Sequence, residues 1–365
     1  MRKFIFICIL IFNFIFSNIP VTASEDAKDY ILESSLNYTA GSVLVMDART
    51  GVVLYETEGY TRRYPASITK IMTALVVLEQ VEDLSERLVF SENAVNLPHY
   101  AGRMNMEAGE SITVLEALYG IMLPSANDIA RALAEHVSGN MADFVTLMNL
   151  RAEELGAYNT RFINPCGLPG DGQFTTAYDI ALIKKAAVQN PLYVEIIGTP
   201  YFDLPPTNIH AETRQMTNSN VMVRPSRAEF NTYVIGGKTG FTNAAQHTLV
   251  TYAKNDRREI IVSVLFASPR GVIFTDTATL IDYIFNELPE PEPPKKMPED
   301  LEIVRVFAYN KIIEISPPPE KQNIPAITAP KEISDIEAMA TASMSVALLG
   351  VALIALALIR KKYYN

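Results

Sequence analysis

The sequence is poor in cysteine, basic runs and histidine, and each shortage excludes a class of protein. Only two of its 365 residues are cysteines. Because Cys8 lies in a segment expected to be removed, Cys166 is left without an intramolecular disulfide partner. A net charge of -10, with no basic run in the central region, argues against nucleic acid as a partner. None of the four histidines has ligand spacing to another, so we expect neither a metal site nor a Ser-His-Asp triad, and no cofactor.

Apolar residues make up 48% of the chain, which supports a buried core. The periodicity predicts strands near the start of the central region and again near its end, with helices between them. The strands are expected at 41–46, 52–56, 233–239, 248–253 and 259–266, and the helices at 112–122, 128–137, 141–155, 176–188 and 277–285. This order predicts one α+β unit whose sheet is made by its two ends.

Both ends of the chain carry membrane-related patterns. Basic residues, an apolar run at 4–16 and small residues at 21–23 predict a signal peptide over 1–23, with an uncleaved anchor as the alternative. Residues 338–359 are 22 residues without a charge, and the basic tail 360–365 follows, which predicts a transmembrane helix with a cytoplasmic end. Ten of the 22 prolines fall within 289–330, so residues 289–337 are expected to form a stalk with at most one short hairpin. The remaining domain is 24–288.

A Ser-x-x-Lys spacing stands at the start of an apolar helix. Ser67 and Lys70 follow Pro65, a helix start signal, and apolar residues recur at helical spacing over 71–78. With a helix beginning near Ala66, the two side chains lie over the same face. A desolvated lysine amine can take the proton of a serine hydroxyl and make it a nucleophile. Alone, the spacing also fits an ordinary surface helix.

Two more short motifs follow in the chain. Ser125 and Asn127 offer a hydroxyl and a carboxamide that a tight turn could direct into a cleft, although a helix cap is a competing interpretation. The second motif, residues 236–242, includes the end of the strand predicted at 233–239, and a strand flanked by glycines leaves its backbone open to a ligand strand. Lys238 and Thr239 then supply a cation and a donor for an anionic group, with a hairpin corner as the competing interpretation.

The three motifs together are the Ser-x-x-Lys, Ser-x-Asn and Lys-Thr-Gly signature of penicillin-binding proteins and related β-lactamases. The residues around them resemble the low-molecular-weight penicillin-binding D-alanyl-D-alanine carboxypeptidases. The likeness covers roughly 36–288 and is carried by the segments 46–51, 65–73, 123–128, 175–179 and 237–242.

This resemblance implies a penicillin-binding/β-lactamase-like transpeptidase fold, with an antiparallel sheet flanked by a helical cluster. It also implies a serine acyl-transfer enzyme at the bacterial cell membrane, with its catalytic domain outside the cytoplasm. The implied substrate is a peptidoglycan stem peptide ending in D-Ala-D-Ala, and removal of its last residue would limit cross-linking. β-Lactams are the implied covalent inhibitors.

The resemblance further implies a role for each motif residue. Ser67 attacks the penultimate D-Ala carbonyl with Lys70 as its base. Ser125 passes the proton to the leaving D-Ala, and Asn127 holds Lys70 and the substrate amide.

The third motif is implied to bind the substrate. Lys238 and Thr239 take the terminal carboxylate. Gly240 and Phe241 are counted with them as substrate-binding residues, and the backbone N–H groups of Ser67 and Phe241 form the oxyanion hole.

Several questions stay open at this stage. Arg270 is displaced from the place where many relatives carry an arginine, and no role is assigned to it. A β-lactamase shares the motifs, but no Glu-x-x-Leu-Asn segment follows Ser125. A silent envelope scaffold that binds stem peptides is the other alternative. The sequence does not separate a carboxypeptidase from an endopeptidase or a weak transpeptidase, and Cys166 is expected to be a buried structural thiol.

Overall fold

The computed structural model describes residues 36–288, all of which lie in one compact unit. The expected signal peptide, stalk, transmembrane helix and basic tail lie outside the described residues. Within 36–288, no helix combines the length and the apolar character needed to cross a bilayer.

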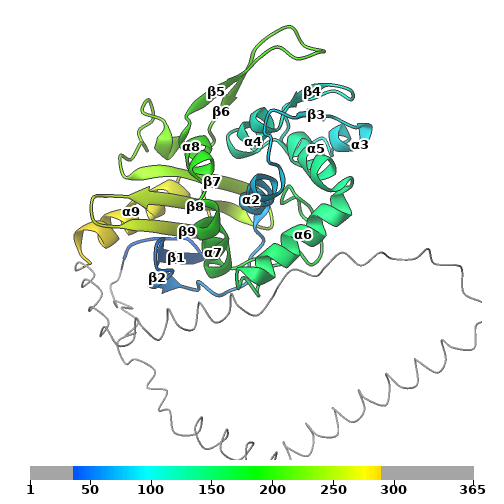
Figure 1. Cartoon of the computed structure of the whole chain (residues 1–365). Coiled ribbons are helices and arrows are strands. Elements are labelled where there is room, and N and C mark those ends of the chain that lie inside the picture. Colours follow the sequence, from blue (N-terminus) through cyan, green and yellow to red (C-terminus); the bar gives the residue numbers. More distant parts are fainter. Residues whose placement is uncertain (1–35, 289–365) are drawn as a thin grey trace, which may run out of the picture. The chain divides into compact units, whose positions relative to one another are not determined.

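A five-stranded antiparallel sheet forms the middle layer of this unit (Figure 1). Its strands are β1 (Ser42–Asp47), β2 (Val53–Thr57), β7 (Val234–Thr242), β8 (Gln246–Lys254) and β9 (Glu259–Ala267). The strand order is β2-β1-β9-β8-β7, and Ser42 of β1 lies opposite Leu265 of β9. The first strands of the unit therefore pair directly with the last, which confirms the expected α+β arrangement.

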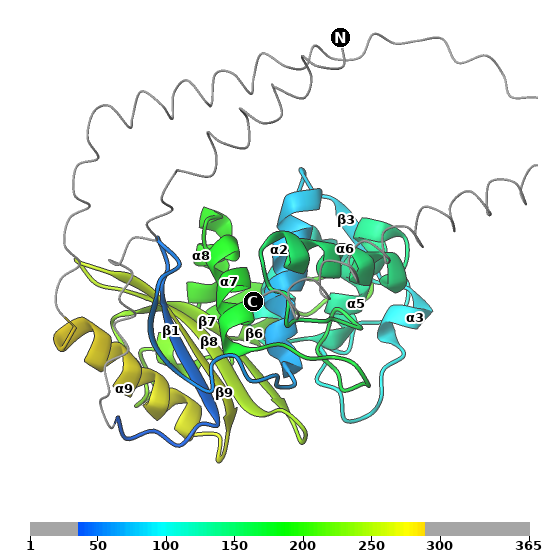
Figure 2. The ribbon, with the colours of Figure 1, turned by 90° about the horizontal axis from the view of Figure 1, so that it is seen from below.

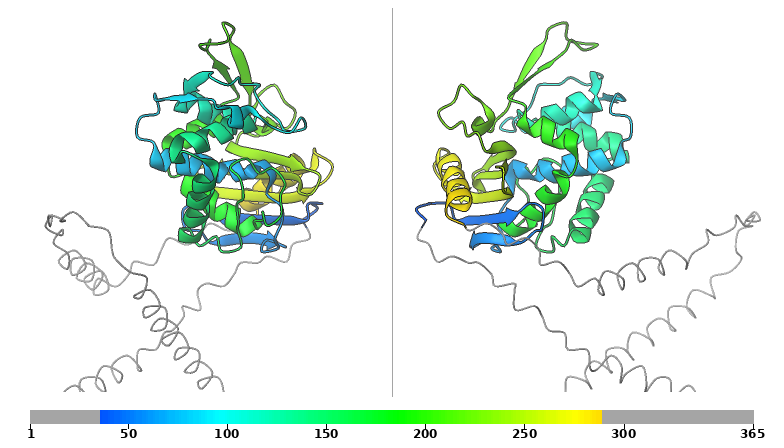
Figure 3. Two further views of the ribbon diagram at one scale, coloured as in Figure 1. Left: turned by 90° about the vertical axis from the view of Figure 1, so that its right-hand side faces the viewer. Right: turned by 60° about the vertical axis from the view of Figure 1, so that its left-hand side comes forward.

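Side chains of β1 alternate between two hydrophobic cores. Val43 and Val45 pack in the core below α9 (Val272–Asn286), whereas Leu44 and Met46 pack in the larger core below the other helices. Successive side chains of a strand point to opposite faces, so an unbroken apolar run fills both cores. Figure 3 shows α9 on one face of the sheet and the helical cluster on the other.

The helical cluster carries most of the remaining chain. Its helices are α2 (Lys70–Gln80), α4 (Val114–Met122), α5 (Asn127–Ser138), α6 (Met141–Glu154), α7 (Ala177–Ala187) and α8 (Pro191–Gly198). Shorter elements are η1 (Ala66–Thr69), α3 (Glu92–Val95), η2 (Val221–Val223) and the strand pairs β3 (Arg87–Val89) with β4 (Ser111–Thr113) and β5 (Tyr201–Leu204) with β6 (Arg214–Thr217).

Helix α2 lies at the centre of this cluster. Every residue from Lys70 to Val77 is buried, and the helix contacts α4, α5, α6 and α7. Figure 2 shows it between α7 on one side and α5 and α6 on the other. A helix that is apolar all round is enclosed on all sides. The start of α2, where Lys70 lies, is therefore held by packing from several directions.

Two predicted helices have different boundaries in the structure. The segment expected as a helix from 112 starts with β4, and α4 begins at Val114 after a capping box formed by Thr113 and Glu116. The closing helix begins at Val272 and not at 277. The pattern predicts no element over 189–232, where the structure has α8 and the β5–β6 pair. Pro191 directly after Asn190 is the start signal that could have located α8.

Within residues 36–288, one lysine in the core has no side chain of opposite charge beside it. Lys184 on α7 is fully buried, and its Nζ donates to the Tyr193 hydroxyl at 3.2 Å. Burial, with no opposing carboxylate among the described residues, lowers the pKa of Lys184 to about 7. The folded state therefore favours the neutral amine.

Replacing this amine should stabilise the protein in a pH-dependent way. Between pH 7 and the ordinary lysine pKa the unfolded state holds one more proton at this site, so the parent protein gains stability as the pH rises. Lys184→Met should raise the free energy of unfolding at pH 7 by on the order of 2 kcal/mol, and this gain should shrink toward about pH 9.5. Chemical denaturation at both pH values measures it. Lys185→Met, at the half-buried neighbour, is the control, and a gain that does not change with pH would contradict the prediction.

Candidate active site

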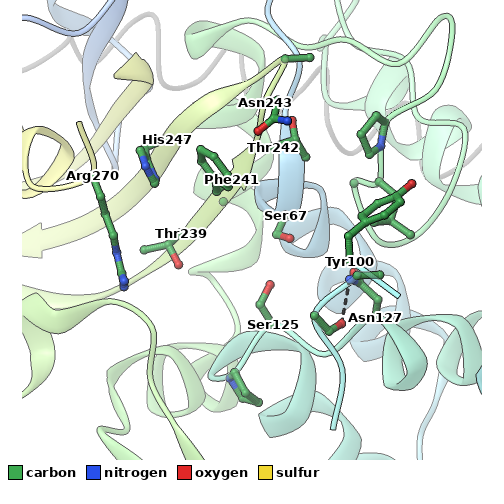
Figure 4. Close-up of a pocket in the computed structure, with 18 of the residues that line it drawn as sticks. Ser67, Tyr100, Ser125, Asn127, Thr239, Phe241, Thr242, Asn243, His247 and Arg270 are labelled. Carbon is green, nitrogen blue, oxygen red and sulfur yellow. Dashed lines mark hydrogen bonds between the residues drawn. The ribbon is translucent and has the colours of Figure 1, made fainter. Parts of the chain in front are cut away.

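A cavity of about 760 Å³ lies between strand β7 and the helical cluster (Figure 4). The predicted site residues that line it are Ser67, Ser125, Asn127, Thr239, Gly240 and Phe241. Lys70 and Lys238 are fully buried beside it. The structure thus brings three motifs that are far apart in the sequence to a single pocket.

Ser67 lies in the 3-10 helix η1, and α2 begins only at Lys70. The helical segment therefore begins at Ala66, as predicted, and its first turn is 3-10. Residues three apart are eclipsed in a 3-10 helix, so the lysine still lies over the serine. The distance from Lys70 Nζ to Ser67 Oγ is 3.3 Å.

The Lys70 amine is surrounded by acceptors. Its Nζ donates to Asn127 Oδ1 at 2.7 Å and to the Cys166 carbonyl at 2.8 Å. Burial lowers the pKa of Lys70 to about 8. A neutral amine has two N–H groups and one lone pair. Because the two oxygens take the two N–H groups, the lone pair of the neutral form faces Ser67.

Ser125 occupies a strained turn at the pocket wall. Its φ is 68°, which is uncommon for a residue other than glycine. Its Oγ is buried and has no hydrogen-bond partner within 36–288. Figure 4 shows this hydroxyl directed into the pocket, across from Ser67. The turn therefore presents a hydroxyl that is available to a bound molecule.

Asn127 is the first residue of α5, but it does not cap the helix. The N-cap residue is Ala126, with no side-chain capping bond. The Asn127 amide instead donates to the Gly102 carbonyl at 2.9 Å while its oxygen accepts from Lys70. The helix-cap interpretation is therefore wrong, and the cleft interpretation agrees with the structure.

Strand β7 passes very close to the serine turn. A Cβ on Gly240 would lie 2.8 Å from Ser67 N and 2.5 Å from Thr248 Oγ1, so only glycine allows this approach. The strand continues to Thr242, and the turn to β8 follows at 243–245. The hairpin-corner interpretation is thus wrong for the Lys-Thr-Gly motif, which lies within the strand.

Lys238 is fully buried next to the lining residue Thr239 and does not itself line the pocket. Its Nζ donates to the Thr239 carbonyl at 2.9 Å. Burial, then the nearby Lys70 and Lys184, lower the pKa of Lys238 well below its ordinary value. Thr239 Oγ1 is hydrogen-bonded to Ser219 Oγ at 2.6 Å. The pocket wall therefore carries the Thr239 hydroxyl, with the buried Lys238 amine directly behind it, and an anion bound nearby would favour the charged form of that amine.

The loop 164–168 holds the Cys166 carbonyl against Lys70. The Asn164 side chain accepts from the backbone N–H groups of Cys166, Gly167 and Leu168, at 3.1, 2.8 and 3.2 Å respectively. The Cys166 thiol is buried and 3.5 Å from the Asn127 carbonyl, as expected of a structural thiol. Sequence reasoning missed the role of the carbonyl, because a backbone acceptor has no residue signature.

The pocket also contains residues to which sequence analysis assigned no role. Arg270 lines it beside Thr239 and His247 (Figure 4). Its position in the sequence is displaced from the place where many relatives carry an arginine, yet its side chain reaches the pocket. His247 stacks on Phe241 with ring centres 4.4 Å apart, and burial, then Arg270, lower its pKa. Tyr100 is 68% exposed on the opposite wall. Within 36–288, no group of three or more side chains is arranged to hold a metal ion.

The fold and this pocket define a class: a serine acyl-transfer hydrolase with a buried lysine beside the nucleophile. The family model of D-alanyl-D-alanine carboxypeptidases matches residues 29–268. The chain belongs to this family of penicillin-binding serine peptidases.

Named relatives agree with this assignment. The chain is 33% identical to the D-alanyl-D-alanine carboxypeptidase DacF of Bacillus subtilis, over 80% of this chain and 74% of the relative. It is 32% identical to the D-alanyl-D-alanine endopeptidase of Escherichia coli, over 67% of this chain and 77% of the relative. A crystal structure of a D-alanyl-D-alanine carboxypeptidase from Mycobacterium tuberculosis aligns with a TM-score of 0.63 at 30% identity, covering 69% of this chain and 93% of that chain.

Two substitutions at Ser125 should separate the effect of the strained turn on stability from the effect of the hydroxyl on activity. Ser125→Gly relieves the positive φ, whereas Ser125→Ala keeps it, and both remove the hydroxyl. We expect the glycine variant to be about 1 kcal/mol more stable than the alanine variant. Both should lose about 100-fold or more in acylation rate. Thermal unfolding and labelled-penicillin acylation measure the two effects, and a glycine variant with parental acylation would contradict a role for the hydroxyl.

Proposed function

We propose that the protein removes the terminal D-alanine from peptidoglycan stem peptides through an acyl-enzyme on Ser67. The observation that carries this proposal is the Lys70 amine, which two carbonyl oxygens orient toward the serine hydroxyl. Family membership supports the same reaction and the same reactivity toward β-lactams.

In the acylation step, Lys70 takes the Ser67 proton as Oγ attacks the penultimate D-Ala carbonyl. The backbone N–H groups of Ser67 and Phe241 stabilise the oxyanion. Close contact between Gly240 and Ser67 N supports this assignment, because it brings the two chain segments together. Ser125 then relays this proton from Lys70 to the departing amine as the amide bond breaks, which leaves Lys70 neutral for the next step.

Substrate binding relies on the corner formed by Lys238 and Thr239. The terminal carboxylate accepts from Thr239 and is paired with Lys238, whose buried ammonium this pairing stabilises. Arg270 adds a second cation on the same side. After D-alanine leaves, water attacks the acyl carbon, its proton returns through Lys70, and Ser67 is freed.

We further propose where this reaction takes place. Residues 1–23 direct export, and 24–288 form the catalytic domain outside the cytoplasm. Residues 289–337 form a stalk, 338–359 cross the membrane, and 360–365 face the cytoplasm. The charge and apolar patterns of these segments support the arrangement. No observation on the described residues favours the β-lactamase or scaffold alternatives.

The nucleophile can be tested directly on the purified protein. A labelled penicillin should form a lasting adduct on Ser67, located by peptide mass spectrometry. A peptide ending in Lys-D-Ala-D-Ala should release free D-alanine, and Ser67→Ala should abolish both results. Rapid turnover of the penicillin would instead indicate a β-lactamase, and absence of both adduct and D-alanine would leave only the scaffold.

The acylation rate should also follow the state of the Lys70 amine. Because burial lowers the pKa of Lys70 to about 8, roughly one amine in ten is neutral at pH 7. We expect the second-order acylation rate constant to rise about tenfold per pH unit below that pKa and to level off above it. Stopped-flow acylation across this range measures the profile. A rate that is constant from pH 6 to about pH 9 would exclude Lys70 as the base.

A further inference from the structure

A second cavity, of about 290 Å³, adjoins the catalytic pocket at Arg270, which lines both. Its wall is built from the segment after η2, which supplies Arg224, Arg227 and Glu229, and from the residues that lead into α9, which supply Arg270. Three guanidinium groups and one carboxylate are the charged groups that line it, in a chain whose net charge is -10. The cavity is therefore positive and should attract an anion.

The arginines of this cavity have spare hydrogen-bonding capacity. Arg224 donates from Nε to the Tyr201 hydroxyl at 3.3 Å and lies over its ring. Arg227 Nε lies 3.6 Å from Glu229 Oε2, which is too long for a hydrogen bond. A guanidinium has five N–H donors in a planar fork, so each arginine retains donors for an incoming anion. The Arg227 side chain is 48% exposed, which leaves the cavity accessible from solvent.

Glu229 indicates what else the ligand carries. Its Oε2 is buried and has no hydrogen-bond partner within residues 36–288. A carboxylate oxygen only accepts, so the group that would satisfy it is a donor. A fully ionised phosphate or carboxylate has no donor and would be repelled by this oxygen. A hydroxyl group next to the anionic group of the same ligand would donate to Oε2 while the arginines hold the anion.

We propose that Arg224, Arg227 and Arg270 bind the phosphate group of a phosphorylated polyol. Glu229 accepts from one of the ligand's hydroxyl groups. The lining residues have a surplus of two positive charges, which suits a phosphate group better than a single carboxylate. This chemistry occurs in free polyol phosphates and, as a diester, in lipid headgroups and polyol-phosphate polymers. The site lies outside the substrate pocket, and binding there does not depend on the proposed function.

Arg270 links this site to the catalytic pocket. In Figure 4 its side chain lies on the Thr239 side, where the proposed function places the terminal carboxylate of the substrate. An anion in the second cavity attracts the same guanidinium and repels that carboxylate. The bound phosphate should therefore weaken substrate binding, and the substrate should weaken phosphate binding by the same factor. This coupling, unlike the binding itself, rests on the proposed function.

Binding is tested by calorimetry on the purified full-length protein at constant ionic strength. The probes are inorganic phosphate, glycerol 3-phosphate as a monoester, and glycerophosphoglycerol as a diester. We expect the parent to bind one of the two polyol phosphates more tightly than inorganic phosphate, because its hydroxyl group reaches Glu229. Tighter binding of the monoester would assign the site to a free polyol phosphate, and tighter binding of the diester to a headgroup or polymer. In Arg224→Gln/Arg227→Gln, the affinity should fall about tenfold or more.

Two further variants control for charge and folding. Arg49→Gln removes a charge from an exposed turn between β1 and β2, and it should leave the affinity for every probe at its parental value. Glu229→Ala removes both the repulsion and the acceptor. It should bind inorganic phosphate more tightly than the parent does and lose the preference for the polyol phosphate. The proposal therefore stays testable if the double variant does not fold.

Release of D-alanine from a stem pentapeptide, with and without the tighter-binding probe, tests the link through Arg270. With the probe present at its Kd, KM should rise about twofold if the two ligands exclude each other. We expect kcat to stay constant, because Arg270 is not assigned to the reacting atoms. The double variant Arg224→Gln/Arg227→Gln should have parental kinetics without the probe and show no rise in KM at this probe concentration.

Each other outcome has a distinct meaning. Absence of saturable binding to the parent, or equal affinity in the parent and the double variant, would overturn the site. Equal affinity of the parent for inorganic phosphate and for both polyol phosphates would overturn the ligand class. Binding that is lost in the double variant, with KM unaffected by the probe in the parent, would overturn the link through Arg270. Intact binding without any release of D-alanine would overturn the proposed function and keep the site.

Discussion

The buried amine of Lys70 is the interaction on which the rest of this site depends. Desolvation favours its neutral form, and the oxygens of Asn127 and Cys166 fix which way its lone pair points. Each of these acceptors comes from a different part of the chain, one from the start of α5 and one from the loop before α7. The pocket is therefore a product of the whole helical cluster. Its chemistry requires that α2, α5 and this loop stay packed around one nitrogen atom.

Packing around α2 and β7 keeps the residues of the site in place. Helix α2 contacts four other helices, and this packing holds Lys70 beside Ser67. On the opposite wall, β7 is held by β8 within a sheet that joins both ends of the unit. Gly240 lets this strand come within contact distance of the serine turn. Helices and sheet thus meet at the nucleophile, and neither layer alone forms the site.

Basic side chains gather around the pocket of a protein whose net charge is -10. Lys70, Lys184 and Lys238 are all fully buried, and desolvation lowers the pKa of each of them. Arg270 lines the pocket on the same side as Thr239 (Figure 4). This distribution of basic side chains favours a substrate that binds with its carboxylate end toward Thr239 and Arg270.

The α+β order of elements and the sheet built from both ends could be predicted from the sequence, because apolar periodicity and strand composition are local signals. The meeting of the three motifs at one pocket was predicted only through their resemblance to a known family. Only the folded chain shows the 3-10 turn at Ser67, the positive φ of Ser125, the Cys166 carbonyl as an acceptor and the place of Arg270. Backbone groups and long, flexible side chains acquire their roles from what packs beside them, and a linear pattern does not contain that information.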